Sequence, residues 1–232
     1  MPGPLELLLG LAPGLAWTVH VARKDDWERE PWRVVLAVFA LGALAAFLIA
    51  VQRPRIEAFW PALDGVPGRV VDAFLVTALS EELAKLAAVA LGALWLAEWD
   101  EPMDGLVYGA AAGLGFAAVE NAYFLSTEGF EVAVFGRVFT AMLAHACFTA
   151  SGALLLGLAR LGAWRATVTL TLLGFAAAVV PHGLYDLLLF GSRGEGLVAL
   201  LALLPAVLGV FALELRWARA LSPDYHPRDA VA

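Results

Sequence analysis

Seven stretches of this sequence are apolar and long enough to cross a lipid bilayer, and no other feature constrains the fold as strongly. A helix that rises 1.5 Å per residue needs about 20 residues to cross roughly 30 Å of hydrocarbon. Short joints rich in charge, Pro or Gly separate the stretches, which cover residues 5–21, 33–51, 70–97, 105–125, 133–159, 167–190 and 197–217. We therefore expect an all-α fold, a polytopic transmembrane helical bundle of about seven spans that forms a single transmembrane domain over residues 1–232.

The composition fits a chain whose main solvent and contact is membrane lipid. Hydrophobic residues make up 61% of the 232 positions and charged residues only 16%, against roughly 25% charged in an average soluble domain. The net charge of −7 comes without any basic run, so we expect no nucleic-acid partner. Arginine outnumbers lysine, and alanine and leucine are abundant, as in proteins of GC-rich bacteria. We expect a multi-pass protein of a bacterial inner membrane.

The informative residues are the polar ones inside these spans, because an ionisable group costs about 2.5–3.5 kcal/mol or more at the centre of a bilayer. They fall on four successive spans with one cluster on each: Glu81, Glu82 and Lys85; Glu120 and Asn121; His145 and Thr149; His182 and Asp186. An enclosed site between helices requires such an arrangement. We predict that site in a motif-bearing core over about residues 70–190.

The first cluster places a lysine between two glutamates. On a helix that advances 100° per residue, Glu82 lies at 100° and Lys85 at 40° if Glu81 is taken as 0°. The ammonium can therefore reach either carboxylate. An ordinary salt bridge between positions i and i+4 is the alternative, but one lysine offsets only one of two adjacent acids, and the second is costly in an apolar span.

The span that carries Glu120 also has glycine at every fourth position, at Gly105, Gly109 and Gly113. A bare face of this kind lets the backbone of a neighbouring helix approach closely. We interpret the glycines as packing residues that bring Glu120 and Asn121 near another helix.

The two histidines each have a polar residue four positions later, Thr149 after His145 and Asp186 after His182. Residues at this spacing lie on one helix face. The second side chain can accept the ring N–H and fix the tautomer, which leaves the other nitrogen for substrate, water or metal. A lone histidine in a membrane span is more often a packing residue, but two such pairs beside three glutamates favour a functional site.

The charges of the predicted site do not balance. If all are ionised, the sum is −3, from −4 on Glu81, Glu82, Glu120 and Asp186 and +1 on Lys85. Shared protons, cationic histidines or a bound divalent metal could each relieve this sum. All three arrangements suit the activation of water, in which a carboxylate accepts a proton and a histidine or metal stabilises an oxyanion.

The combined motifs resemble the PrsW family of intramembrane proteases. The matching residues run in order over about half of the chain and comprise Glu81-Glu82-x-x-Lys85, Asp104-Gly105, Tyr108-Gly109, Gly113-Leu114-Gly115-Phe116, Glu120-Asn121, His145 with Thr149, and His182-x-x-x-Asp186. This family is related to the CAAX prenyl endopeptidases and the bacterial Abi proteins. In those relatives, a paired-glutamate helix and histidines form a water-activating site inside a helical bundle.

The resemblance implies that Glu81 and Glu82 are central to catalysis, with Glu120, His145 and His182 beside them. We predict that Glu81 is the general base, that Glu82 and Lys85 position it, and that the two histidines stabilise the oxyanion. Labels within the family divide between glutamic protease and metalloprotease. A metal-dependent version would use Glu120, His145 and His182 as ligands, a mixed nitrogen and oxygen set that suits zinc. The supporting residues would be Lys85, Asn121, Thr149 and Asp186.

The predicted activity is hydrolysis of a peptide bond in a membrane-anchored protein, and the resemblance implies anti-sigma factors as substrates. Other protease motifs, such as His-Glu-x-x-His and Gly-x-Ser-x-Gly, do not occur in the sequence. An ion- or proton-coupled carrier is the main alternative, because acids and histidines in spans also mark ion pathways. A non-catalytic membrane scaffold is a third possibility. The sequence leaves the oligomeric state open.

Overall fold

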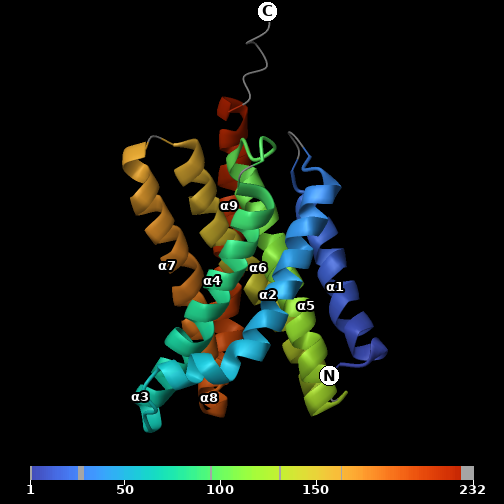
Figure 1. Cartoon of the computed structure of the whole chain (residues 1–232), viewed down its shortest axis with the longest axis vertical. Helices are drawn as coiled ribbons and strands as arrows, with labels where there is room; N and C mark the ends of the chain where they lie inside the picture. Colours follow the sequence, from blue (N-terminus) through green and yellow to red (C-terminus); the bar gives the residue numbers. More distant parts are fainter. Residues whose placement is uncertain (1, 26–28, 95, 131, 163, 226–232) are drawn as a thin grey trace, which may run out of the picture.

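The computed structural model describes residues 2–25, 29–94, 96–130, 132–162 and 164–225, and it is helical throughout apart from short connections (Figure 1). The described residues contain no strand, so the predicted all-α class is confirmed. The helices are α1 Pro4–Ala22, α2 Trp32–Phe59, α3 Gly65–Val70, η1 Val71–Ala78, α4 Leu79–Val89, η2 Ala90–Leu94, α5 Pro102–Glu128, α6 Val132–Leu161, α7 Trp164–Leu189, α8 Arg193–Val198, η3 Ala199–Leu203 and α9 Leu204–Tyr225.

These helices form seven long segments that match the seven predicted spans. The third segment joins α3, η1, α4 and η2, and the seventh joins α8, η3 and α9, where η denotes π-helical turns. Six of the seven are long and apolar enough to cross a membrane, as judged over the described residues by length and composition. The third is the exception, because it alternates between α and π geometry and carries Glu81, Glu82 and Lys85.

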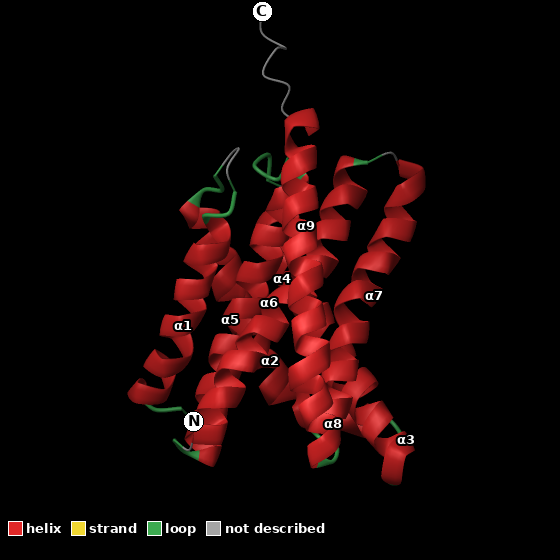
Figure 2. Ribbon diagram, turned by 180° about the vertical axis from the view of Figure 1, so that it is seen from behind, coloured by secondary structure: helices red, strands yellow, loops and turns green. Residues whose placement is uncertain are grey.

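Helix α5 is the central helix of the bundle and is buried along almost its whole length. It packs on α6, α2 and α1, and α9 covers α6 and α5 from the other side (Figure 2). The glycine face of α5 explains this closeness. A Cβ atom at Gly109 would lie 2.6 Å from the Cα of Ala150 on α6, and one at Gly105 would lie 2.7 Å from the carbonyl oxygen of Ala153. The predicted packing role of these glycines is confirmed.

The outer faces of the bundle are apolar, as a lipid solvent demands. Large hydrophobic side chains stay exposed on α2, α7 and the last segment, including Leu48, Leu172 and Leu201. An apolar surface of this extent on a soluble protein would drive association. The polar clusters predicted from the sequence turn the other way, toward the space enclosed by α4, α5, α6 and α7.

Candidate active site

The paired glutamates of α4 are buried and share one lysine, as the helical spacing predicts. The Nζ atom of Lys85 lies 3.2 Å from Oε2 of Glu81 and 2.8 Å from Oε1 of Glu82. It also lies 2.8 Å from Nδ1 of His145 on α6, a contact between helices that the sequence did not predict. Lys85 is completely buried, and its ammonium sits 4.1 Å from the ring centre of Phe116. The hydrogen bond from the ammonium of Lys85 to the ring of His145 therefore links α4 to α6.

Glu82 is fully buried, and its carboxylate contacts three other side chains of the site. Its Oε1 accepts from Lys85 and lies 2.8 Å from Nδ1 of His182, while its Oε2 accepts from the hydroxyl of Thr149 at 2.9 Å. Each oxygen of Glu82 is thus committed to protein donors. Such a carboxylate is suited to fixing its neighbours rather than to exchanging protons with water.

His145 is held on both ring nitrogens. Nδ1 faces the ammonium of Lys85, and Nε2 lies 2.8 Å from Oε2 of Glu120 on α5. Because a charged lysine can only donate, Nδ1 is the acceptor and the proton of the neutral ring sits on Nε2, where it donates to Glu120. Glu120 keeps 23% of its side chain exposed, more than the other acids of the site.

His182 lies between three carboxylates. Its Nδ1–H donates to Glu82, and its Nε2 faces Oδ2 of Asp186 at 3.4 Å and Oε2 of Glu81 at 3.8 Å. The predicted pairing with Asp186 is therefore confirmed. A lone pair on Nε2 cannot face two carboxylates without a proton or a cation between them. The ring also stacks on Phe148, with centroids 5.3 Å apart.

Thr149 makes a contact different from the one expected, whereas Asn121 lies against another helix, as expected. Thr149 does not bond the ring of His145, because the rotation of α6 turns its hydroxyl toward Glu82 instead. Asn121 donates from Nδ2 to the carbonyl oxygen of Val138 at 3.1 Å and so ties α5 to α6. It is not among the residues that line the cavity described next.

A cavity of about 270 Å³ opens beside these groups. Glu81, Glu120, His145, His182 and Asp186 line it, whereas Glu82 and Lys85 are not among its lining residues. The remaining lining residues are Arg53, Thr77, Phe124, Ala141, Ala144, Phe148, Tyr185, Leu189 and Phe190. Arg53 was not foreseen, since a charge at the end of an apolar span normally faces solvent; here it donates to Thr77 at the cavity wall.

Among the described residues, Glu81, His145 and His182 each offer one ligand atom, and these atoms lie within 4.8 Å of one another. This group contains Glu81 in place of the Glu120 named from the sequence. Two histidines and one glutamate are a donor set that zinc favours in hydrolases. His182 fits well, because Glu82 accepts its other ring N–H, as metal-binding histidines require. His145 fits only after it releases Lys85 or Glu120.

Comparison with known proteins decides the family. The profile described as PrsW family intramembrane metalloprotease matches residues 30–212, which include every site residue above. The chain belongs to this family. The resemblance seen in the motifs is thereby confirmed, and the protein is a multi-pass intramembrane protease rather than a carrier or a scaffold.

Several curated relatives are similar over most of the chain. Protease PrsW of Geobacillus kaustophilus is 33% identical over 212 residues, which cover 90% of this chain and 86% of the relative. Protease PrsW of Bacillus subtilis is 33% identical over 180 residues, 78% of this chain and 80% of the relative. Protease PrsW of Oceanobacillus iheyensis is 31% identical over 192 residues. These relatives are bacterial, and no solved structure matches the chain.

Proposed function

We propose that this protease hydrolyses a peptide bond of a membrane-anchored protein in the cavity lined by Glu81, Glu120, His145 and His182. The observation that carries the proposal is the convergence of these four side chains, from α4, α5, α6 and α7, on one cavity inside a bundle of membrane-length helices. Burying an ionisable group inside a membrane costs free energy. A role in helix packing alone does not explain why four ionisable side chains line the same cavity.

Glu120 is the best placed general base. It lines the cavity, is the most exposed acid of the group, and is oriented by His145 at 2.8 Å. A carboxylate in this position can take a proton from a water that attacks the scissile carbonyl and then pass it to the leaving amide nitrogen. This assignment moves the role from Glu81, which we named from the sequence, because Glu81 belongs to the group of mutually close ligand atoms.

Glu81, His145 and His182 are the residues that would hold the metal implied by the family description, and zinc suits the set. When bound, zinc supplies a Lewis acid that polarises the scissile carbonyl and makes a nearby water more acidic. Glu82 keeps His182 in one tautomer through Nδ1, and Thr149 keeps Glu82 in place. In a metal-free version Glu81 would be the base, with His145 and His182 donating to the oxyanion.

The substrate enters as an extended segment of a membrane-anchored protein, of which anti-sigma factors are one class. A second hollow of about 360 Å³ adjoins the cavity and shares with it Arg53, Thr77, Asp186 and Phe190. Both hollows are lined by residues of η1 and α7. A peptide bond reaches the acids only if its helix unwinds, because a helical backbone hides its carbonyls in internal hydrogen bonds.

The test uses the purified full chain in liposomes with a panel of membrane-tethered fluorogenic peptides. Glu81→Gln should lower cleavage by about 10²-fold or more, and a chelator should do the same to the wild type, with zinc restoring activity. Glu214→Gln is the matched control, because Glu214 is another half-buried acid of the bundle that bonds Ser151 away from the cavity. Wild-type liposomes that take up ions but never cleave a peptide would refute the proposal.

A further inference from the structure

The side chains that line the catalytic cavity are spaced by whole helical turns. On α6 they are Ala141, Ala144, His145 and Phe148, and on α7 they are His182, Tyr185, Asp186 and Leu189. Both sets follow the spacing i, i+3, i+4 and i+7, which marks one continuous face of a helix. The cavity therefore extends beyond the catalytic groups, over about two turns of each helix.

The lining faces of α6 and α7 run antiparallel. A Cβ atom at Gly152 of α6 would lie 2.9 Å from the carbonyl oxygen of Gly174 on α7. Seven residues earlier on α6, the ring of His145 lies 5.0 Å from that of His182, which comes eight residues later on α7. Because the partners move in opposite directions along the two helices, Ala141 lies beside the turn of α7 that follows His182.

A second layer of cavity residues lies one to two helical turns from the catalytic ones. This outer layer consists of Thr77, Phe124, Ala141 and Leu189. Its members lie four or seven residues from Glu81, Glu120, His145 and His182, in that order. The spans that contain α4, α5, α6 and α7 alternate in direction (Figure 1). A step back along the first and third and a step forward along the second and fourth therefore lead to the same end of the cavity.

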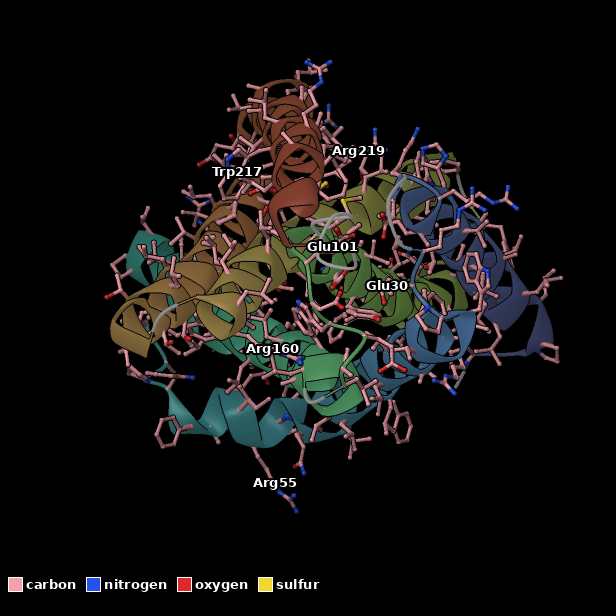
Figure 3. All side chains as sticks on the ribbon, turned by 90° about the horizontal axis from the view of Figure 1, so that it is seen from above. Glu30, Arg55, Glu101, Arg160, Trp217 and Arg219 are labelled. Atoms are coloured by element: carbon pink, nitrogen blue, oxygen red, sulfur yellow. The ribbon has the colours of Figure 1, made fainter. Side chains whose placement is uncertain are left out.

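The outer layer is apolar except at its rim. Thr77 and Leu189 are half-buried, whereas His145 and His182 are buried, so the cavity opens on the side of the outer layer. Arg53 of α2 borders this side and donates from Nη1 to Thr77 at 3.1 Å. Two residues later, Arg55 points away from the bundle in the view from above (Figure 3). The remaining members of the outer layer carry only hydrocarbon side chains, which suit an apolar ligand group.

We propose that the outer layer binds an apolar side chain of the substrate and that Ala141 determines how large this side chain can be, an inference that rests on the proteolytic function proposed above. Four residues of a helix span about 6 Å, and an extended peptide advances about 3.3 Å per residue. The outer layer therefore receives a side chain from within two positions of the scissile bond. Ala141 has the smallest side chain of the layer and leaves room for a residue the size of leucine.

The experiment compares Ala141→Leu with the wild-type full chain in liposomes. A membrane-tethered fluorogenic peptide that the wild type cleaves is mapped by mass spectrometry, and each position within two residues of the cut is then made alanine or leucine in turn. At one of these positions the wild type should give the higher kcat/KM with leucine. Ala141→Leu should lower kcat/KM for that leucine peptide by about 10-fold or more, and the value for the matching alanine peptide should stay close to that of the wild type.

Ala176→Leu is the matched control, because Ala176 is an exposed alanine of α7 that does not line the cavity. It should leave both values unchanged. An equal loss for the two peptides in Ala141→Leu, or an unchanged ratio between them, overturns the size-determining role, while cleavage by the wild type still supports the proteolytic function. A wild type that cleaves no peptide overturns both.

Should Ala141→Leu fail to fold, Leu189→Ala decides the matter, because it enlarges the outer layer instead of filling it. This variant should raise kcat/KM for a peptide with phenylalanine at the selective position relative to the peptide with leucine there. An unchanged ratio between these two peptides overturns the proposal.

Discussion

Replacing Lys85 with methionine tests the charge balance on which the whole site depends. The ammonium makes three contacts of 2.8–3.2 Å, two of them to buried carboxylates. Methionine has a similar length but no charge, so Glu81 and Glu82 would be left to repel one another. Removing one partner of a buried ion pair typically costs about 3–5 kcal/mol. We expect Lys85→Met to lower the free energy of unfolding by that amount when metal is absent.

The free energy of unfolding can be measured by titrating the protein in mixed detergent with SDS. Lys24→Met is the matched control, since Lys24 is the other lysine of the chain and lies outside the site. The substitution also frees Nδ1 of His145, so added zinc should stabilise Lys85→Met more than it stabilises the wild type. A loss below about 1 kcal/mol, as for an exposed pair, would refute the reasoning.

Three further substitutions test the supporting contacts. Thr149→Val removes the donor to Oε2 of Glu82 and should lower the free energy of unfolding by about 1–3 kcal/mol, with Thr149→Ser as the control that keeps it. Gly109→Leu places a side chain at a position where even a Cβ atom would lie 2.6 Å from the Cα of Ala150. In the same titration it should lower the free energy of unfolding by at least about 1–3 kcal/mol. Gly136→Leu is the control, because Gly136 is exposed and a Cβ atom there meets no other atom within 4 Å. Glu120→Gln should lower kcat with little change in KM for a tethered peptide if Glu120 is the base; unchanged kcat would return that role to Glu81.

The features that could be predicted from the sequence are those that one helix determines by itself. The spans follow from hydropathy, and the place of Lys85 between Glu81 and Glu82 follows from 100° per residue. His182 and Asp186 meet for the same reason. The glycine face of α5 predicted that another helix packs closely against it, and that helix is α6.

The features that escaped prediction depend on how one helix is rotated against another. Thr149 shares a face with His145, but the rotation of α6 decides that its hydroxyl meets Glu82 on α4. The same rotation brings Nδ1 of His145 within hydrogen-bonding distance of the ammonium of Lys85.

The charge sum of the catalytic cavity connects Lys85 to metal binding. Glu81, Glu82, Glu120 and Asp186 contribute −4 and Lys85 contributes +1, which leaves −3. A divalent cation would bring the net charge of these groups to −1, and one added proton would bring it to zero. His145 cannot serve both Lys85 and a metal through its present contacts, since Lys85 holds Nδ1 and Glu120 holds Nε2. Release of Glu120 from His145 would leave Nε2 available to the metal. A metal ligand role for Nε2 of His145 and its hydrogen bond to Glu120 are therefore alternatives, and binding of a metal there would require Glu120 to move.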